Sequence, residues 1–135
     1  MPAKDRVILD DCYNASPLSM RAALEALVSV AQKKKIAVLG DMLELGPKSA
    51  ALHAEIGAYA GERADEVIAF GPLSNHLAEA AAKKLGAEHV MHTEDPNDAA
   101  ERVLQVSGPG DVILVKASRG MRLERVIDKL LEMLG

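Results

Sequence analysis

The sequence of 135 residues predicts one α/β domain, with a mostly parallel sheet of about five or six strands and helices on both faces. Runs that are apolar throughout alternate with amphipathic helical runs along the whole chain, a pattern typical of parallel strands buried on both faces. The length suits a single domain spanning residues 1–135. Its 49% hydrophobic and 27% charged residues are those of an ordinary globular protein.

Five short apolar runs are the predicted strands. They are residues 7–9, 36–39, 67–70, 89–92 and 112–115. The run at 89–92 is the weakest, because it begins and ends with histidine. Buried strands separated by helices form βαβ units, so we predict a Rossmann-like sheet.

Five segments with apolar residues at helical spacing are the predicted helices. They lie within residues 17–31, 52–60, 77–85, 96–104 and 123–134. Ser16-Pro17 and Asp95-Pro96 each combine a favoured N-cap with a proline suited to the first helical position. Gly86 is the predicted end of the third helix.

Composition argues against several classes of partner. Sixteen basic and twenty acidic residues give a net charge of -4, which disfavours nucleic acid and anionic membranes. Only 2% of the residues are aromatic, too few for the stacking platforms of single-strand binders. The lone Cys12 predicts a reducing, cytoplasmic location. No apolar run approaches the roughly 20 residues that span a bilayer.

Polar side chains gather at three predicted strand ends. Ligands bind beyond the carboxyl ends of the strands in an open parallel sheet. Residues 10–17, 40–46 and 116–120 follow the first, second and last strands and are rich in functional groups. The ends at 71–73 and 93–95 are typical of ordinary turns and caps.

Residues after the first strand have structural as well as functional interpretations. Ser16 fits a helix N-cap, since Pro17 follows it. Asp11 and Asn14 suit turns, because short polar side chains bond their own backbone. The local sequence favours neither a turn nor a functional role for these two.

The other two polar segments leave similar alternatives open. Asp41 and Glu44 resemble a paired-carboxylate site, or they are solvated loop residues. Lys116, Ser118 and Arg119 precede a predicted helix, whose first N–H groups form a competent anion site. Capping alone would also explain the serine.

Several common site signatures are missing from the sequence. It contains neither the G-x-G-x-x-G fingerprint nor the G-x-x-x-x-G-K-[ST] phosphate loop. The histidines at 53, 76, 89 and 92 have no recognised metal spacing, and we expect His53 and His76 on solvated helix faces. Cys12 is predicted to be a small packing residue. We therefore predict no metal ligand and no catalytic residue in this chain.

Three motifs, in this order, resemble the C-terminal domain of Mur ligases. They are Leu9-Asp10-Asp11-Cys12-Tyr13-Asn14-Ala15-Ser16-Pro17 with Ser19-Met20, then residues 37–46 (AVLGDMLELG), then residues 115–121 (VKASRGM). The resemblance covers essentially the whole chain. Ser16 stands where many relatives carry Asn, and Ala117 where many carry Gly.

The resemblance implies an ATP-dependent amide ligase of peptidoglycan precursor synthesis, closest to the ligases that add D-alanyl-D-alanine to UDP-N-acetylmuramoyl-tripeptide. In that family ATP phosphorylates the tripeptide's terminal carboxylate, and the dipeptide amine attacks the acyl phosphate. The family has three domains, of which this chain resembles only the last. Separate N-terminal and central domains would bind the UDP-sugar and hold the phosphate loop with Mg²⁺.

The resemblance also implies roles for individual residues. Asp11 would meet the ATP ribose, Asn14 would lie against the base side of the nucleotide, and Tyr13 would also bind ATP. A second group would face the dipeptide and the reacting phosphates: Asp41, Glu44, Lys116, Ser118 and Arg119. A guanidinium fork at 119 suits a carboxylate or a phosphate.

Other interpretations remain open at this level. The chain could be the C-terminal domain of another Mur ligase or of a folylpolyglutamate synthase relative. It could also be a stand-alone Rossmann-like binding module without catalysis. A phosphate-loop motif upstream of the chain would favour the ligases.

Overall fold

A computed structural model describes residues 2–3 and 5–134. A single six-stranded sheet has the order β1-β2-β6-β3-β4-β5. The strands are β1 (Pro2–Ala3), β2 (Arg6–Asp11), β3 (Lys35–Gly40), β4 (Glu66–Phe70), β5 (Val90–Thr93) and β6 (Val112–Lys116). Strands β2 to β6 are parallel, and β1 pairs antiparallel with β2 at the edge.

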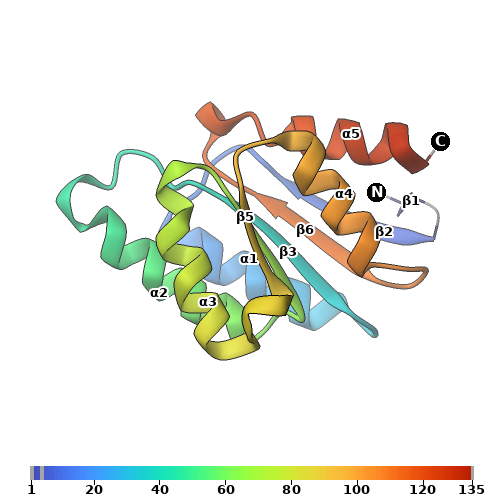
Figure 1. The fold of residues 1–135 in the computed structure, drawn as a ribbon, viewed down its shortest axis with the longest axis horizontal. Helices are drawn as coiled ribbons and strands as arrows, with labels where there is room; N and C mark the ends of the chain where they lie inside the picture. The colour runs from blue at the N-terminus through green and yellow to red at the C-terminus, as the bar shows by residue number, and fades with distance from the viewer. Residues whose placement is uncertain (1, 4, 135) are drawn as a thin grey trace.

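Helices cover both faces of the sheet, which confirms the predicted fold class. They are α1 (Pro17–Val30), α2 (Ser49–Gly61), α3 (Asn75–Leu85), α4 (Pro96–Val106) and α5 (Glu124–Leu134). Apolar residues of α1, α2 and α3 pack on one face, and those of α4 and α5 on the other. Figure 1 shows α4 and α5 together, away from α2 and α3. No helix among residues 2–3 and 5–134 is long and apolar enough to cross a membrane.

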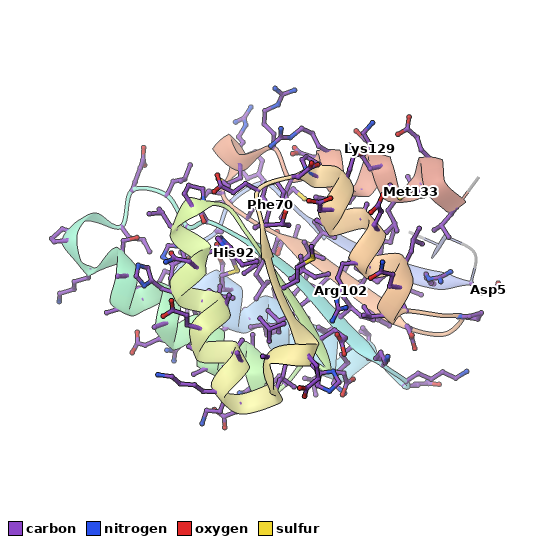
Figure 2. The ribbon with its side chains drawn as sticks, viewed as in Figure 1. Asp5, Phe70, His92, Arg102, Lys129 and Met133 are labelled. Carbon is purple, nitrogen blue, oxygen red and sulfur yellow. The ribbon has the colours of Figure 1, made fainter. Side chains whose placement is uncertain are left out.

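Two apolar clusters share the sheet between them. The side chains of β6 alternate, so Val112 and Leu114 join the cluster under α1 to α3. Ile113 and Val115 join the cluster under α4 and α5. Phe70, labelled in Figure 2, is 2% exposed and belongs to the second cluster. Both faces of the central strands are therefore buried, as their continuous apolar sequences predict.

The helix ends confirm the predicted caps. The Ser16 hydroxyl accepts from the backbone N–H of Ser19, and Asp95 accepts from that of Asn97. Gly86 follows α3 with a φ of 96°, a conformation that favours glycine. These local signals place the first turn of α1 directly beside the polar segment that follows β2.

The structure also differs from the prediction in places. The weak strand predicted at 89–92 lies one residue later, after a short 3-10 turn at Ala87–His89. A second 3-10 turn, Arg119–Met121, separates β6 from α5. Ser118 and Arg119 therefore do not begin the last helix, and Ser118 makes no side-chain capping bond.

Candidate functional site

The three polar segments meet at the carboxyl edge of the sheet, because β6 lies between β2 and β3. Lys116 of β6 pairs in register with Asp11 of β2 on one side and with Leu39 of β3 on the other. The chain leaves β2 and β3 toward helices on one face, whereas it leaves β6 toward α5 on the opposite face. Such a reversal of direction is where open α/β sheets bind ligands.

Lys116 connects two of these segments. Its Nζ donates to Asp11 Oδ2 at 2.7 Å and to the carbonyl oxygen of Asn14 at 2.9 Å. The Lys116 side chain is only 3% exposed, whereas that of Asp11 is 46% exposed. The ammonium thus lies beneath the loop, and the Asp11 carboxylate lies at the surface.

The loop after β3 is held by hydrogen bonds from three different elements. Asp41 N–H donates to Phe70 O (3.1 Å), Met42 N–H to His53 Nε2 (3.0 Å) and Leu43 N–H to Ser118 Oγ (2.9 Å). Three successive backbone donors are therefore satisfied by β4, by α2 and by the segment after β6. This bonding fixes the loop relative to the end of β6.

Asp41 and Glu44 lie in different environments. Asp41 is 1% exposed, and its carboxylate accepts from the Ser74 hydroxyl at 2.7 Å and from Leu73 N–H at 3.2 Å. Glu44 is exposed, with a φ of 64°, and lines an open hollow. Asp41 is therefore a buried link to the segment after β4, and only Glu44 faces solvent.

His53 was missed as part of this site, and the expectation of a solvated His53 is wrong. The residue is fully buried, and its Nδ1 lies 2.8 Å from the carbonyl oxygen of Ser49. Because Nε2 accepts from Met42, Nδ1 carries the proton. No signal in the sequence connects His53 with a loop eleven residues earlier, since only the tertiary fold brings them together.

Two shallow hollows open on either side of Arg119. One has a volume of about 430 Å³ and is lined by Asp10, Asp11, Cys12, Tyr13, Arg119 and Glu124. The other has a volume of about 290 Å³ and is lined by Asn14, Leu43, Glu44, Ser118, Arg119 and Gly120. Tyr13 is 72% exposed, and the Arg119 guanidinium lies 5.2 Å from the centroid of its ring. Six of the eight site residues predicted from the sequence line these hollows, and the other two, Asp41 and Lys116, do not.

Cys12 is a packing residue, as predicted, although it borders the first hollow. It is 5% exposed and its thiol lies 3.7 Å from the carbonyl oxygen of Val115. Burial, followed by the nearby Asp10 carboxylate, raises the pKa of the thiol far above its usual value. A thiol that stays protonated is a poor nucleophile, so the site offers no cysteine for covalent chemistry.

The arrangement can bind a polar ligand that carries both hydroxyl and anionic groups. A fixed carboxylate accepts hydrogen bonds from hydroxyl groups, and an exposed aromatic ring provides a stacking surface. A guanidinium between the two hollows can bind a carboxylate or a phosphate with paired hydrogen bonds. Within residues 2–3 and 5–134, no group of three His, Cys, Asp or Glu side chains is placed to hold a metal ion.

Sequence comparison identifies the family of the chain. The profile of the family described as Mur ligase, glutamate ligase domain, matches residues 2–119. The chain belongs to this Mur ligase domain family. All three polar segments lie within the matched residues, except for Gly120 at the end of the third.

Relatives of this Mur ligase domain are similar over nearly its whole length. A UDP-N-acetylmuramoyl-tripeptide--D-alanyl-D-alanine ligase of Bacillus subtilis is 42% identical over 127 residues, which cover 93% of this chain and 28% of that protein. The crystal structure of the Thermotoga maritima MurF ligase in complex with ADP is 35% identical, with a TM-score of 0.81 over 99% of this chain. A MurF structure from Acinetobacter baumannii, 28% identical over 98% of this chain, gives a TM-score of 0.86.

The Mur ligase domain is much shorter than these relatives. It spans 30% of the Thermotoga chain and 29% of the Acinetobacter chain. The fold of this domain is therefore shared with less than a third of each of those ligases.

Proposed function

We propose that this chain is the C-terminal domain of an ATP-dependent ligase that joins D-alanyl-D-alanine to UDP-N-acetylmuramoyl-tripeptide. The observation that carries the proposal is the meeting of Asp11, Tyr13 and Arg119 around one hollow at the carboxyl ends of β2 and β6. The name of the Bacillus subtilis relative, a UDP-N-acetylmuramoyl-tripeptide--D-alanyl-D-alanine ligase, and the MurF structures support the same substrates. They favour this ligase over other Mur ligases, a folylpolyglutamate synthase relative and a binding module without catalysis.

The first hollow fits the nucleoside part of ATP. Lys116 binds one carboxylate oxygen of Asp11, so the other oxygen is available to ribose hydroxyl groups. The exposed Tyr13 ring offers its face to the base, and Asn14 adds an amide on the same loop. The ADP-bound structure among the relatives supports a nucleotide site in ligases of this type.

The second hollow fits the dipeptide and the reacting groups. Arg119 would bind a carboxylate or a transferring phosphate. Ser118 would donate a hydrogen bond through its O–H group, because its oxygen already accepts one from Leu43 N–H. Glu44 is exposed and would attract the dipeptide's ammonium group. Catalysis by this domain would consist of orientation and charge stabilisation, with no general base among these residues.

Asp41 and Lys116 would support these contacts from behind, because both side chains are buried. The rest of the ligase would bind the UDP-sugar and would hold the ATP phosphates with Mg²⁺. A cytoplasmic location follows from this proposal, because ATP is a cytoplasmic substrate. The lone, buried Cys12 is compatible with that location.

Kinetics of the complete ligase containing this domain test the proposal. The assay measures ATP-dependent joining of D-alanyl-D-alanine to UDP-N-acetylmuramoyl-tripeptide, for the unchanged protein and for Asp11→Asn. Losing a charged hydrogen bond to the ribose costs about 1.5–3 kcal/mol, so the KM for ATP should rise roughly 10- to 150-fold.

Asp128→Asn on the exposed surface of α5 is the matched control and should leave the KM for ATP unchanged. Absence of the ligated product with the unchanged protein would refute the proposed reaction. An Asp11→Asn variant with an unaltered KM for ATP would refute the nucleotide site.

A further inference from the structure

We infer that Lys116 is a positioning residue, which fixes the Asp11 carboxylate and the loop of residues 11–14 in the conformation that receives ATP. The inference rests on the proposed function, because it takes the hollow beside Asp11 as the nucleotide site. It differs from the expectation that Lys116 itself contacts the substrate.

The two partners of the ion pair differ in burial. The Lys116 side chain is 3% exposed, while 46% of the Asp11 side chain remains accessible. Both hydrogen bonds found for the ammonium go to the protein, at 2.7 Å to Asp11 Oδ2 and 2.9 Å to Asn14 O. A ligand in the hollow therefore meets the carboxylate, and the ammonium acts on the ligand only through Asp11 and the loop.

The strand register explains why Lys116 is placed to do this. Lys116 and Asp11 are Cα partners on adjacent parallel strands. Side chains alternate along β6, so Lys116 points to the same face as Val112 and Leu114, the face covered by α1. The loop of residues 11–14 leads into α1, and the ammonium lies under it.

Each of the two bonds fixes a different degree of freedom. The bond to Asp11 Oδ2 holds the carboxylate in one rotamer, with the second oxygen available. The bond to Asn14 O holds the backbone that carries Tyr13 and Asn14. A carboxylate ordered before the ligand arrives avoids an entropic cost on binding.

A double-mutant cycle in the complete ligase tests the inference. The variants are Lys116→Met, Lys116→Arg, Asp11→Asn and the Lys116→Met/Asp11→Asn pair, each measured for kcat and for the KM of ATP and of dipeptide. Lys116→Met should raise the KM for ATP about 10-fold, because the carboxylate and the loop must then be ordered when ATP binds. The KM for dipeptide should stay unchanged.

Coupling between the two residues distinguishes positioning from direct contact. If Lys116 acts through Asp11 and the loop, the loss of ATP affinity in the double variant should be clearly smaller than the sum of the two single losses. Lys116→Arg keeps the charge and should recover part of the lost affinity. If Lys116→Met does not fold, as shown by its thermal unfolding, Lys116→Arg alone should still show a raised KM for ATP with an unchanged KM for dipeptide.

Lys34→Met is the matched control, because Lys34 also donates to a backbone carbonyl, that of Val106, away from the candidate site. It should leave every KM unchanged. Additive losses in the double variant, or a change in the KM for dipeptide instead of ATP, would overturn the inference. If Asp11→Asn raises the KM for ATP and Lys116→Met does not, the inference alone fails. If Asp11→Asn has no effect, the proposed nucleotide site fails as well.

Discussion

Arg119 occupies the most informative position at the scale of single residues. It lines both hollows, and its guanidinium lies 5.2 Å from the centroid of the exposed Tyr13 ring. The side chain is exposed, while Ser118 before it is buried and bound to Leu43 N–H. Ser118 thus fixes the backbone next to Arg119, while the exposed Arg119 side chain lies between the two hollows.

Replacement of Arg119 by lysine separates geometry from charge. Lysine keeps the positive charge but loses the planar pair of donors. In the complete ligase, kcat/KM for ATP or for dipeptide should therefore fall about tenfold or more, the cost of roughly one charged hydrogen bond. The free energy of unfolding should change by less than about 0.5 kcal/mol, since the side chain is exposed.

Steady-state kinetics and a urea melt of the same variant measure both quantities. Arg122→Lys, in the same turn and also exposed, is the control and should leave both unchanged. Wild-type kinetics for Arg119→Lys would remove this residue from the site.

The Cys12 thiol makes the free energy of unfolding depend on pH. Its raised pKa means that the folded thiol stays neutral where the unfolded thiol, with a pKa of about 8.5, ionises. The contribution of the neutral Cys12 thiol to the free energy of unfolding is fully present below about pH 8.5. It is lost as the pH rises above that value, at about 1.4 kcal/mol per pH unit. The free energy of unfolding of the wild type, relative to that of Cys12→Ala, should therefore decrease between pH 8.5 and 9.5.

Urea denaturation of both proteins at the two pH values measures that difference, and groups common to both cancel. A difference that does not change with pH would contradict the buried, neutral thiol. Rapid alkylation of the folded protein at neutral pH would do so too.

At the scale of secondary structure elements, local chemistry explains which ends could be predicted. Ser16 and Asp95 begin α1 and α4 because each stands before a proline and caps its own helix, so neighbours in sequence suffice. Ser118 resembles such a cap, yet its hydroxyl binds Leu43 N–H, 75 residues away in sequence. A local pattern cannot show a long-range partner that competes for the same oxygen.

Helices α2 and α3 touch through a glycine. A Cβ added to Gly57 of α2 would lie 2.1 Å from the carbonyl oxygen of Leu77 in α3. Gly57→Ala should therefore destabilise the protein by about 1–3 kcal/mol, because the helices must move apart. Chemical denaturation with urea measures the change.

Gly108→Ala is the matched control, since a Cβ there meets no atom within 4 Å. Its stability should stay within about 1 kcal/mol of wild type. Equal stabilities for the two variants would contradict the close approach of α2 and α3.

At the scale of the whole molecule, the two apolar clusters lie on opposite faces of one sheet. They share strands β3, β4 and β6, so neither cluster can open without exposing the back of the other. We expect the isolated chain to unfold in one cooperative transition, seen at the same temperature by circular dichroism and calorimetry.

The same chain should form no ATP-dependent ligation product by itself, at any magnesium concentration, since its sequence carries no phosphate loop. Mass spectrometry of the reaction mixture checks this, with the complete ligase as the positive control. Measurable ligation by the chain alone would contradict our assignment of the chemistry to two or more domains.

The place of the candidate site could be predicted from a rule about whole sheets, whereas the hydrogen bonds within it could not. The rule that ligands bind at the carboxyl ends of parallel strands points to residues 10–17, 40–46 and 116–120, although the sequence does not show that their strands are neighbours. The sequence could not show that Asp41 and Lys116 turn inward, because side-chain direction at a strand end depends on which helix covers that face. The contact between His53 and Met42 could not be predicted from the sequence either, because only the tertiary fold brings the two residues together.

The central place of β6 has a consequence for synthesis on the ribosome. β6 is the last strand in sequence, yet it separates β2 from β3, so a nascent chain that stops before Val112 leaves β2 without a parallel neighbour. The facing edges of β2 and β3 then expose unpaired backbone groups, which invite pairing with other chains. Contacts of such long sequence separation also form slowly. The domain therefore acquires its sheet only after nearly all of its residues have been made, and a folding chaperone would have most to protect in that interval.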